Sequence, residues 1–184
     1  MKTKLMTVRL HRKGARITNY RKRLKLLMGK QPRVVVRKSV HFISAQLVEY
    51  KDSGDVVLAQ AHSSELAEFG YKASPKNLPA AYLTGMLLAR RALKNKCKSG
   101  VLDSGLYPSI QGNKIYAALK GAVDGGLAVP HDAAVLPKAD RLTGKHIVDY
   151  AKSVKGHAHM FKVHPGDDLP AQVESAKKKI MEMK

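Results

Sequence analysis

The stretch Arg33-Val34-Val35-Val36-Arg37-Lys38 decides the fold, because a run of β-branched residues between cations is typical of a buried β-strand. Residues 40–50 follow and alternate with a period of two, which predicts a second strand. One side of it carries Phe42, Ser44, Gln46 and Val48, and the other His41, Ile43, Ala45, Leu47 and Glu49. The turn Lys51–Asp55 leads to a third strand, Val56–Ala61. Connections this short predict an antiparallel three-strand meander.

Helical periodicity follows the meander. It predicts a long helix over Leu78–Lys96 and a second one from Gly112-Asn113 to Gly125-Gly126. Between them, Val101–Asp103 is expected to be a short strand that pairs in parallel with an earlier strand, because a helix supplies the crossover. The predicted fold class is therefore α/β, a mixed sheet that opens with the meander and has helices packed on it.

The chain is expected to have three parts. Residues 1–30 form a basic N-terminal arm with a short helix, residues 31–150 a globular α/β domain, and residues 151–184 a C-terminal extension. Two further helices are predicted over Arg141–Ser153 and Ala171–Met183, with a loop over Gly156–Pro170 between them.

The short helix of the arm is predicted over Thr18–Met28, with Thr18 as its cap and Gly29 at its end. An apolar stripe along this helix can rest on the sheet, while the cations point away. The stripe consists of Ile17, Tyr20, Leu24 and Leu27.

The charge of the chain excludes a neutral metabolic enzyme as the default. Thirty-four Lys and Arg stand against fourteen Asp and Glu, a formal net charge of +20. Residues 1–48 carry fourteen of these cations and no acid, since Glu49 is the first carboxylate. Such a segment meets either a nucleic acid or a membrane surface. Its apolar residues are scattered and form no continuous face for a membrane, so nucleic acid is favoured.

No membrane or secretory segment is expected. The longest stretch without a charged side chain, Asn77–Ala89, has thirteen residues, fewer than the roughly 18 to 20 that a spanning helix needs. Lys25 interrupts the apolar run near the N-terminus, and no small-residue cleavage site follows it. We therefore expect a cytoplasmic protein without a membrane partner. The lone Cys97 fits a reducing compartment as a small buried thiol.

Three groups of residues have chemistry-bearing side chains, and each has a simpler interpretation. The run His62-Ser63-Ser64-Glu65 suits a turn in which Ser63 or Ser64 caps the next helix. Gly112-Asn113-Lys114 lacks the glycine spacing and the ending of a nucleotide loop, although anion contact stays open. A metal site is not expected from the loosely spaced His157, His159 and His164 near Asp167 and Asp168, which suit a polar loop.

A nuclease on a mixed sheet needs carboxylates that converge on Mg²⁺. The charged residues of the first strand, Arg33–Lys38, have the wrong sign, and Asp103 has no acidic neighbour within twenty residues. We therefore expect no catalytic residue, no metal and no cofactor.

The sequence resembles the archaeal-type large-subunit ribosomal protein L-eighteen family in several ordered blocks over about residues 8–150. These blocks are Thr18-Asn19-Tyr20-Arg21-Lys22-Arg23-Leu24, Pro32–Ser39, Ala59–Leu66, Asn77–Gly85, Val101–Leu106, Ala117–Leu127 and Pro130-His131. The resemblance implies a structural protein, and not an enzyme, that binds 5S rRNA and anchors it in the central protuberance of the large subunit. It also implies contacts with the large-subunit rRNA and neighbouring ribosomal proteins, and a ribonuclease-H-like sheet without catalytic carboxylates.

The resemblance places the RNA contacts on the arm and the first strands. The expected residues are Arg9, Arg12, Lys13, Arg16, Tyr20, Arg21, Lys22, Arg23, Lys25, Arg33, Arg37, Lys38, Ser39 and His41. Tyr20 can stack on a base or pack on the sheet. Two alternatives remain open, an RNA-processing enzyme on the same ribonuclease-H-like fold and a basic protein that compacts DNA.

Overall fold

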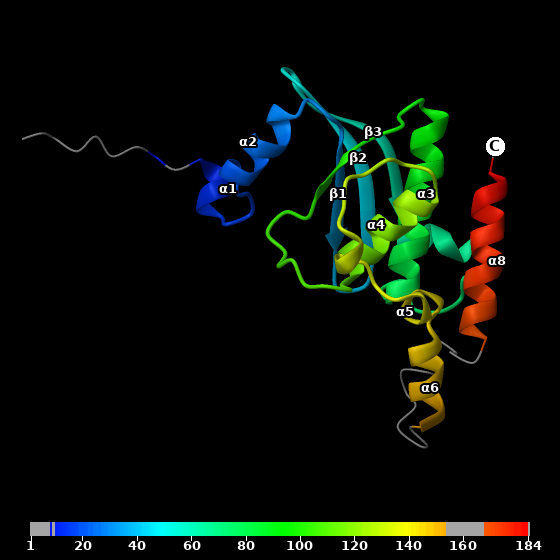
Figure 1. Cartoon of the computed structure of the whole chain (residues 1–184). Helices are drawn as coiled ribbons and strands as arrows, with labels where there is room; N and C mark the ends of the chain where they lie inside the picture. Colours follow the sequence, from blue (N-terminus) through cyan, green and yellow to red (C-terminus); the bar gives the residue numbers. More distant parts are fainter. Residues whose placement is uncertain (1–7, 9, 154–167, 184) are drawn as a thin grey trace, which may run out of the picture.

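The computed structural model describes residues 8, 10–153 and 168–183, and these residues form an α/β fold around a four-stranded mixed sheet (Figure 1). The strands are β1 (Arg33–Lys38), β2 (Ile43–Lys51), β3 (Gly54–His62) and β4 (Val101–Asp103). Their order is β3-β2-β1-β4. The predicted antiparallel meander is confirmed, and so is the predicted parallel pairing of Val101–Asp103 with an earlier strand, which the structure identifies as β1.

The two faces of the sheet differ as the period of two predicts. Val34 and Val36 of β1 are buried together with Ile43, Ala45 and Leu47 of β2. Since side chains alternate along a strand, Arg33, Val35 and Arg37 occupy the opposite face, which we call the open face. The β2–β3 register shifts between Leu47 and Val48, a bulge that the sequence did not predict.

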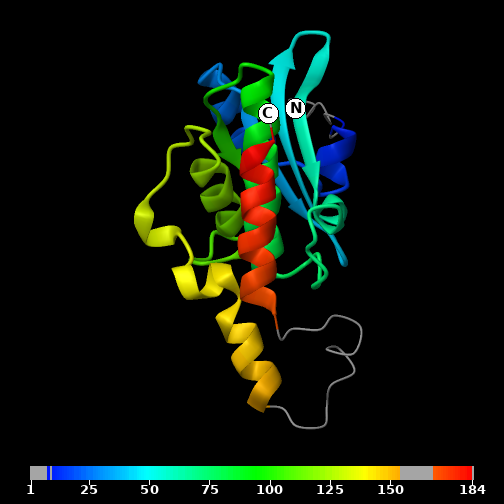
Figure 2. The same ribbon diagram turned by 90° about the vertical axis from the view of Figure 1, so that its right-hand side faces the viewer.

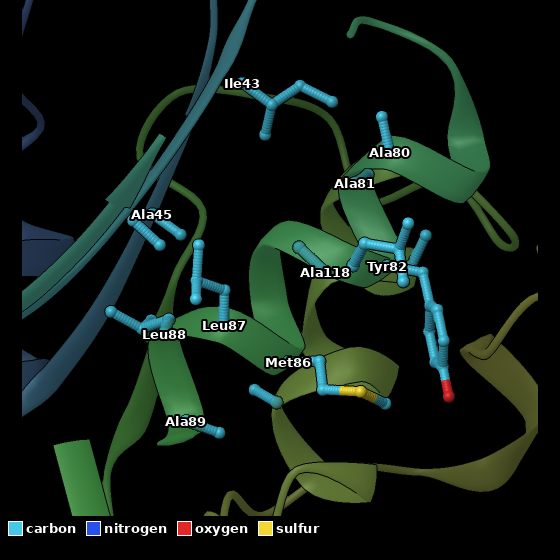
Figure 3. Packing of buried hydrophobic residues seen from close by; sticks show 14 of the residues in the cluster. Ile43, Ala45, Ala80, Ala81, Tyr82, Met86, Leu87, Leu88, Ala89 and Ala118 are labelled. Atoms are coloured by element: carbon cyan, nitrogen blue, oxygen red, sulfur yellow. The ribbon is translucent and has the colours of Figure 1, made fainter. Parts of the chain in front are cut away.

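Two helices cover the inner face, α3 (Leu78–Lys94) and α4 (Lys114–Asp124), with Asn77 and Asn113 as their caps. Figure 3 shows Ala45 of the sheet, Leu87 of α3 and Ala118 of α4 around one core. The small side chains let the helices approach closely. A Cβ added at Gly85 would lie 1.9 Å from the carbonyl oxygen of Ala118, so only glycine fits there.

The described residues of the C-terminal part add helices α5 (Ala139–Thr143), α6 (Lys145–Ser153) and α8 (Leu169–Glu182). The single helix expected over Arg141–Ser153 is interrupted, because Gly144 takes a left-handed conformation with φ 83°. The expected loop over Gly156–Pro170 lies mostly outside the described residues, and its last two residues already belong to α8. A short 3₁₀ turn, η2 (Ala133–Val135), lies in the connection before α5.

Helix α8 packs lengthwise on α3, as both views show (Figures 1 and 2). It contributes to the core with a stripe of buried side chains at helical spacing, Leu169, Val173, Ala176 and Ile180.

The arm forms α1 (His11–Gly14) and α2 (Tyr20–Met28), and α2 lies on the side of the sheet away from α3 (Figure 1). The prediction that its apolar stripe rests on the sheet is wrong, because α2 has no buried residue and Leu24 is 63% exposed. The predicted cap is wrong as well. Asn19, not Thr18, accepts the backbone N–H groups of Arg21 and Lys22.

After β3 the chain makes a 3₁₀ turn, η1 (Ser63–Ala67). Its cap is not a serine, as predicted, but His62, whose Nδ1 accepts from the backbone of Ser64 while Glu65 accepts from the backbone N–H of His62. Cys97 is half-buried, less enclosed than the expected buried thiol. Among the described helices, none combines the length and apolar character needed to cross a bilayer.

Candidate nucleic-acid interface

A groove of about 370 Å³ lies between α2 and the open face of the sheet, and we call it the α2 groove. Its wall on the other side is formed by the loop that leaves β4, Ser104–Leu106. Six of the lining side chains are cationic and one is a carboxylate, namely Arg12, Lys22, Arg23, Lys25, Arg33, Arg37 and Asp103. A concave surface with such an excess of positive charge attracts a polyanion.

At the floor of the α2 groove, Arg33 is 4% exposed and forms two ion pairs. Its Nη1 donates to Oδ2 of Asp103 over 3.0 Å, and its Nη2 donates to Oδ2 of Asp55 over 2.8 Å. Its Nε is buried and has no hydrogen-bond partner. In this structure the Arg33 guanidinium therefore interacts with protein carboxylates and is turned away from solvent.

Arg37 lies two residues further along the same face. Its Nη1 donates to the backbone oxygens of Val36 and Asp103, each over 2.8 Å, and its Nη2 donates to Oδ1 of Asp103 over 3.3 Å. The side chain remains 40% exposed. One side of the guanidinium packs closely against Gly105, where an added Cβ would lie 3.0 Å from the guanidinium carbon. Arg37 thus presents one edge of a fixed planar cation to the solvent.

Arg23 connects α2 to the sheet. Its Nη2 donates to both carboxylate oxygens of Asp55, at 3.1 and 2.9 Å. Asp55 also forms an ion pair with Arg33. This one carboxylate therefore links the helix to the floor of the α2 groove. The Arg23–Asp55 ion pair connects α2 to the sheet, whereas no residue of the expected apolar stripe is buried.

The remaining predicted contacts of the arm are mostly solvent-exposed. Arg12 donates from Nε to the hydroxyl of Thr18 over 2.9 Å, and Tyr20 is half-buried at the start of α2. Lys13, Arg16, Arg21, Lys22 and Lys25 are exposed cations. Arg9 lies outside the described residues.

The predicted contacts after Arg37 lie at the end of β1. The Nζ of Lys38 is 4.9 Å from the ring centroid of Tyr107, whose hydroxyl donates to the carbonyl of Lys38 over 2.8 Å. The hydroxyl of Ser39 accepts from the backbone of Phe42 and closes the turn to β2. The exposed ring of His41 meets the ring of Phe42 edge-on. Ser39 therefore shapes the turn, while Lys38 and His41 remain exposed to solvent beside aromatic rings.

Sequence reasoning missed the two carboxylates that organise the α2 groove. The sequence predicts a hairpin turn at Asp55 and a strand without acidic neighbours at Asp103, although both carboxylates orient predicted RNA-contact arginines. One signal was available. The sequence predicts that the strand of Asp103 pairs in parallel with an earlier strand, and in the structure this pairing places Asp103 beside Val35, on the same face as Arg33 and Arg37.

The chemistry-bearing groups considered as alternatives do not converge on a metal-binding geometry within the described ranges. These ranges contain no group of three or more His, Cys, Asp or Glu side chains able to hold a metal ion. The carboxylate of Asp103 is occupied by Arg33, by Arg37 and by the backbone N–H of Gly105. His157, His159, His164 and Asp167 lie outside the described residues.

The comparisons with known proteins point to the ribosome. Residues 4–101 and 95–132 match the family described as "Ribosomal large subunit proteins 60S L5, and 50S L18". The "Large ribosomal subunit protein uL18" of Methanococcus maripaludis is 44% identical over 176 residues, which cover 90% of this chain and 91% of that relative. The protein of the same name from Korarchaeum cryptofilum is 45% identical over 148 residues, which cover 80% and 76% of the two chains.

These relatives are named as ribosomal proteins and not as enzymes, which agrees with the prediction that the chain is not an enzyme. The family match and the relatives each cover most of the chain, and they coincide with the resemblance identified from the sequence blocks. The chain therefore belongs to the family of large-subunit ribosomal proteins described as 60S L5 and 50S L18.

Proposed function

We propose that this ribosomal protein binds 5S rRNA through its arm and the α2 groove, and anchors it in the central protuberance beside the large-subunit rRNA and neighbouring proteins. The observation that carries the proposal is the α2 groove, where six cationic side chains meet a single carboxylate. Lysines and arginines that neutralise RNA phosphates release counterions, and this release supplies most of the affinity.

The rigid and the exposed cations would have different tasks. Arg33 is buried against Asp55 and Asp103, so we assign it to positioning the floor of the groove. Lys22 and Lys25 are exposed on α2, where they can follow phosphates on a long flexible stem. Arg37 combines the two properties. Its guanidinium is fixed by hydrogen bonds within the protein, and one of its edges is exposed to solvent. Such an edge suits an oriented contact to a phosphate or a base.

We also infer that the sheet is of the ribonuclease-H-like type that the resemblance implied. Two features support this inference, the three-strand antiparallel meander and the fourth strand that joins β1 in parallel after a helical crossover. The acid on the added strand, Asp103, is neutralised by Arg33 and Arg37. That arrangement suits a binding protein on a fold whose enzymes need free carboxylates for Mg²⁺.

The direct test is a titration of 5S rRNA with the full chain, with transfer RNA and duplex DNA as competitors. The double variant Lys22→Gln/Lys25→Gln removes two cations that line the groove. It should reduce the slope of log K against log salt by about 1.4 to 1.8, since each phosphate contact contributes about 0.7 to 0.9. The matched control is Lys72→Gln/Lys178→Gln, which removes two exposed lysines on the side of the molecule that carries α8. Equal slopes for the two double variants would reject the α2 groove as the RNA site.

The same titration separates the proposal from the other function classes. Equal affinity for duplex DNA and 5S rRNA would favour a DNA-compacting protein. Hydrolysis of labelled RNA by the parent chain in the presence of Mg²⁺ would favour an RNA-processing enzyme. A footprint of the complex on 5S rRNA would identify the protected nucleotides.

A further inference from the structure

Strand β1 ends, and helices α3 and α4 begin, at the same end of the sheet (Figure 1), and each of these three places carries a lysine. These lysines are Lys38, the last residue of β1, Lys76, which comes just before the cap of α3, and Lys114, the first residue of α4. We call these three residues the lysine cluster. Of the three, only Lys38 belongs to the RNA contacts expected from the sequence.

The strand geometry explains why Lys38 reaches the helices. Val34 and Val36 point into the core between the sheet and the helices, and Lys38 continues the same alternation one step beyond the core. Arg37 points to the open face and lines the α2 groove. The end of β1 therefore carries a cation on each of its two faces.

The two helices add to the positive character of this place. Both α3 and α4 begin beside the lysine cluster, with Asn77 and Asn113 as their caps. Each cap side chain accepts one backbone N–H, from Ala80 and Tyr116 respectively. The N–H of Leu78 in α3 and those of Lys114 and Ile115 in α4 precede the hydrogen-bond ladder, while Pro79 has no N–H to offer. Helix N-termini favour anions for this reason. The carboxyl end of a strand in a parallel pair is also where α/β sheets commonly bind their ligands.

The cations of the lysine cluster are not neutralised by the part of the chain that the structure describes. No described carboxylate forms an ion pair with any of the three ammonium groups, although seven other ion pairs connect described residues. Among the described residues, the ammonium group of Lys38 has one side-chain partner, the ring of Tyr107. Burial, followed by the charges of Lys76 and Lys38, lowers the pKa of Lys114 below its ordinary value of 10.5. Like charges gathered in this way oppose folding unless an anion joins them.

We propose that Lys38, Lys76 and Lys114, with the N-termini of α3 and α4, form a binding site for a backbone phosphate of RNA, separate from the α2 groove. The proposal rests on the proposed function, because it takes the ligand to be the same rRNA. Since Arg37 and Lys38 are adjacent, one RNA strand that passes the end of β1 can contact the α2 groove with one phosphate and the lysine cluster with another.

The first experiment measures the salt dependence of 5S rRNA binding for the double variant Lys76→Gln/Lys114→Gln. Between 50 and 200 mM salt, the loss of the one phosphate contact made by the lysine cluster should make the affinity of the double variant about threefold less sensitive to salt than that of the parent. The matched control is Lys94→Gln/Lys98→Gln, two exposed lysines between the end of α3 and the start of β4. A salt sensitivity for the site variant equal to that of the control overturns the proposal.

The second experiment identifies the source of the phosphate. Lysines carrying ¹³C-methyl groups keep their charge and report their pKa by NMR, and Lys114→Gln assigns the signal of interest. Saturation with 5S rRNA should raise the pKa of Lys114 toward or above its ordinary value, and leave that of Lys98 unchanged. An unchanged pKa of Lys114 overturns the proposal. An equal rise with millimolar inorganic phosphate alone would assign the site to free anions and overturn its assignment to RNA.

The two proposals fail in different ways. If the parent chain does not bind 5S rRNA, the proposed function fails, and large-subunit rRNA replaces it in the NMR titration. A rise in the pKa of Lys114 then still supports the lysine cluster as a phosphate site, and no rise rejects it. If the parent binds 5S rRNA while Lys114 does not respond, only the lysine cluster fails.

Discussion

Arg33 and Asp103 form a buried ion pair across the parallel strands β1 and β4, with a distance of 3.0 Å between Nη1 and Oδ2. The two residues are 70 positions apart in the sequence. The pair fixes the floor of the α2 groove, and through Asp55 it is connected to Arg23 of α2. The same carboxylate also orients Arg37. One acid on a three-residue strand thus positions two arginines on the face proposed to bind RNA.

Replacing Asp103 by Asn should destabilise the fold by about 3 kcal/mol, because it leaves the buried charge of Arg33 with only the partly exposed Asp55 as a partner. The control is Asp140→Asn, which breaks the exposed pair with Lys145 and should cost less than about 1 kcal/mol. Urea unfolding of both variants gives the comparison. Similar losses of unfolding free energy in the two variants would show that the buried Arg33–Asp103 pair stabilises the fold no more than an exposed pair does.

The contact between α3 and α4 should not tolerate a single methyl group. A Cβ at Gly121 would lie 1.9 Å from the carbonyl oxygen of Tyr82, so Gly121→Ala must push the helices apart and should cost about 3 kcal/mol or more. A Cβ added at Gly14 would have no atom within 4 Å. Gly14→Ala should therefore change the free energy of unfolding by less than about 0.5 kcal/mol. Thermal unfolding measures both, and a mild effect at Gly121 would contradict the close helix approach.

Arg37→Lys keeps the charge and removes the planar fork that bonds to Val36 and Asp103. We expect it to weaken 5S rRNA binding by about 1 kcal/mol, whereas Lys22→Arg on the exposed face of α2 should be nearly neutral. Anisotropy titrations at several salt concentrations give both values. Thermal melting serves as the control for folding, since the inward hydrogen bonds of Arg37 also support the fold. The opposite ranking would contradict the division between positioned and flexible cations.

The charge of Lys114 should oppose folding when no RNA is present. Its pKa is lowered in the folded protein, so the unfolded chain binds more protons and this lysine makes stability rise as the pH increases toward 10.5. Lys114→Gln should therefore raise the melting temperature at pH 7 by on the order of 1 °C, as expected for relief of a like-charge contact. The gain should shrink near pH 10.5. A calorimetric scan at the two pH values checks both statements, and a lower melting temperature at pH 7 would contradict them.

Much of the fold could be predicted from local patterns. The alternation from Ile43 to Leu47 identified the inner face of β2, because a period of two leaves no other assignment when one face is buried. The helix before Val101 implied the parallel pairing of β4. The break at Gly144 was missed, since a glycine inside a helical pattern is compatible with either a continuous or an interrupted helix until the packing decides.

The candidate site could be predicted only in part. The absence of acids before Glu49 marked the arm as the basic region, and charge balance is a property of the sequence itself. The stripe on α2 was misread because periodicity shows which residues share a face and says nothing about what covers that face. Leu24 lies on such a stripe and is exposed, while Arg23 makes the contact with the sheet.

The sequence by itself determined the class of fold, the basic arm and the family, because these depend on residue types at short and regular spacing. Only the tertiary structure decided which cations are free. Arg33 and Lys38 are both cations of the same strand, and no local rule distinguishes them. Arg33 meets Asp55 and Asp103, which folding brings from distant positions, whereas the charge of Lys38 acts on Lys114 and helps to lower its pKa. The charge that a side chain can offer to RNA depends on its neighbours in space, because Coulomb interactions follow distance through the fold and not separation along the chain.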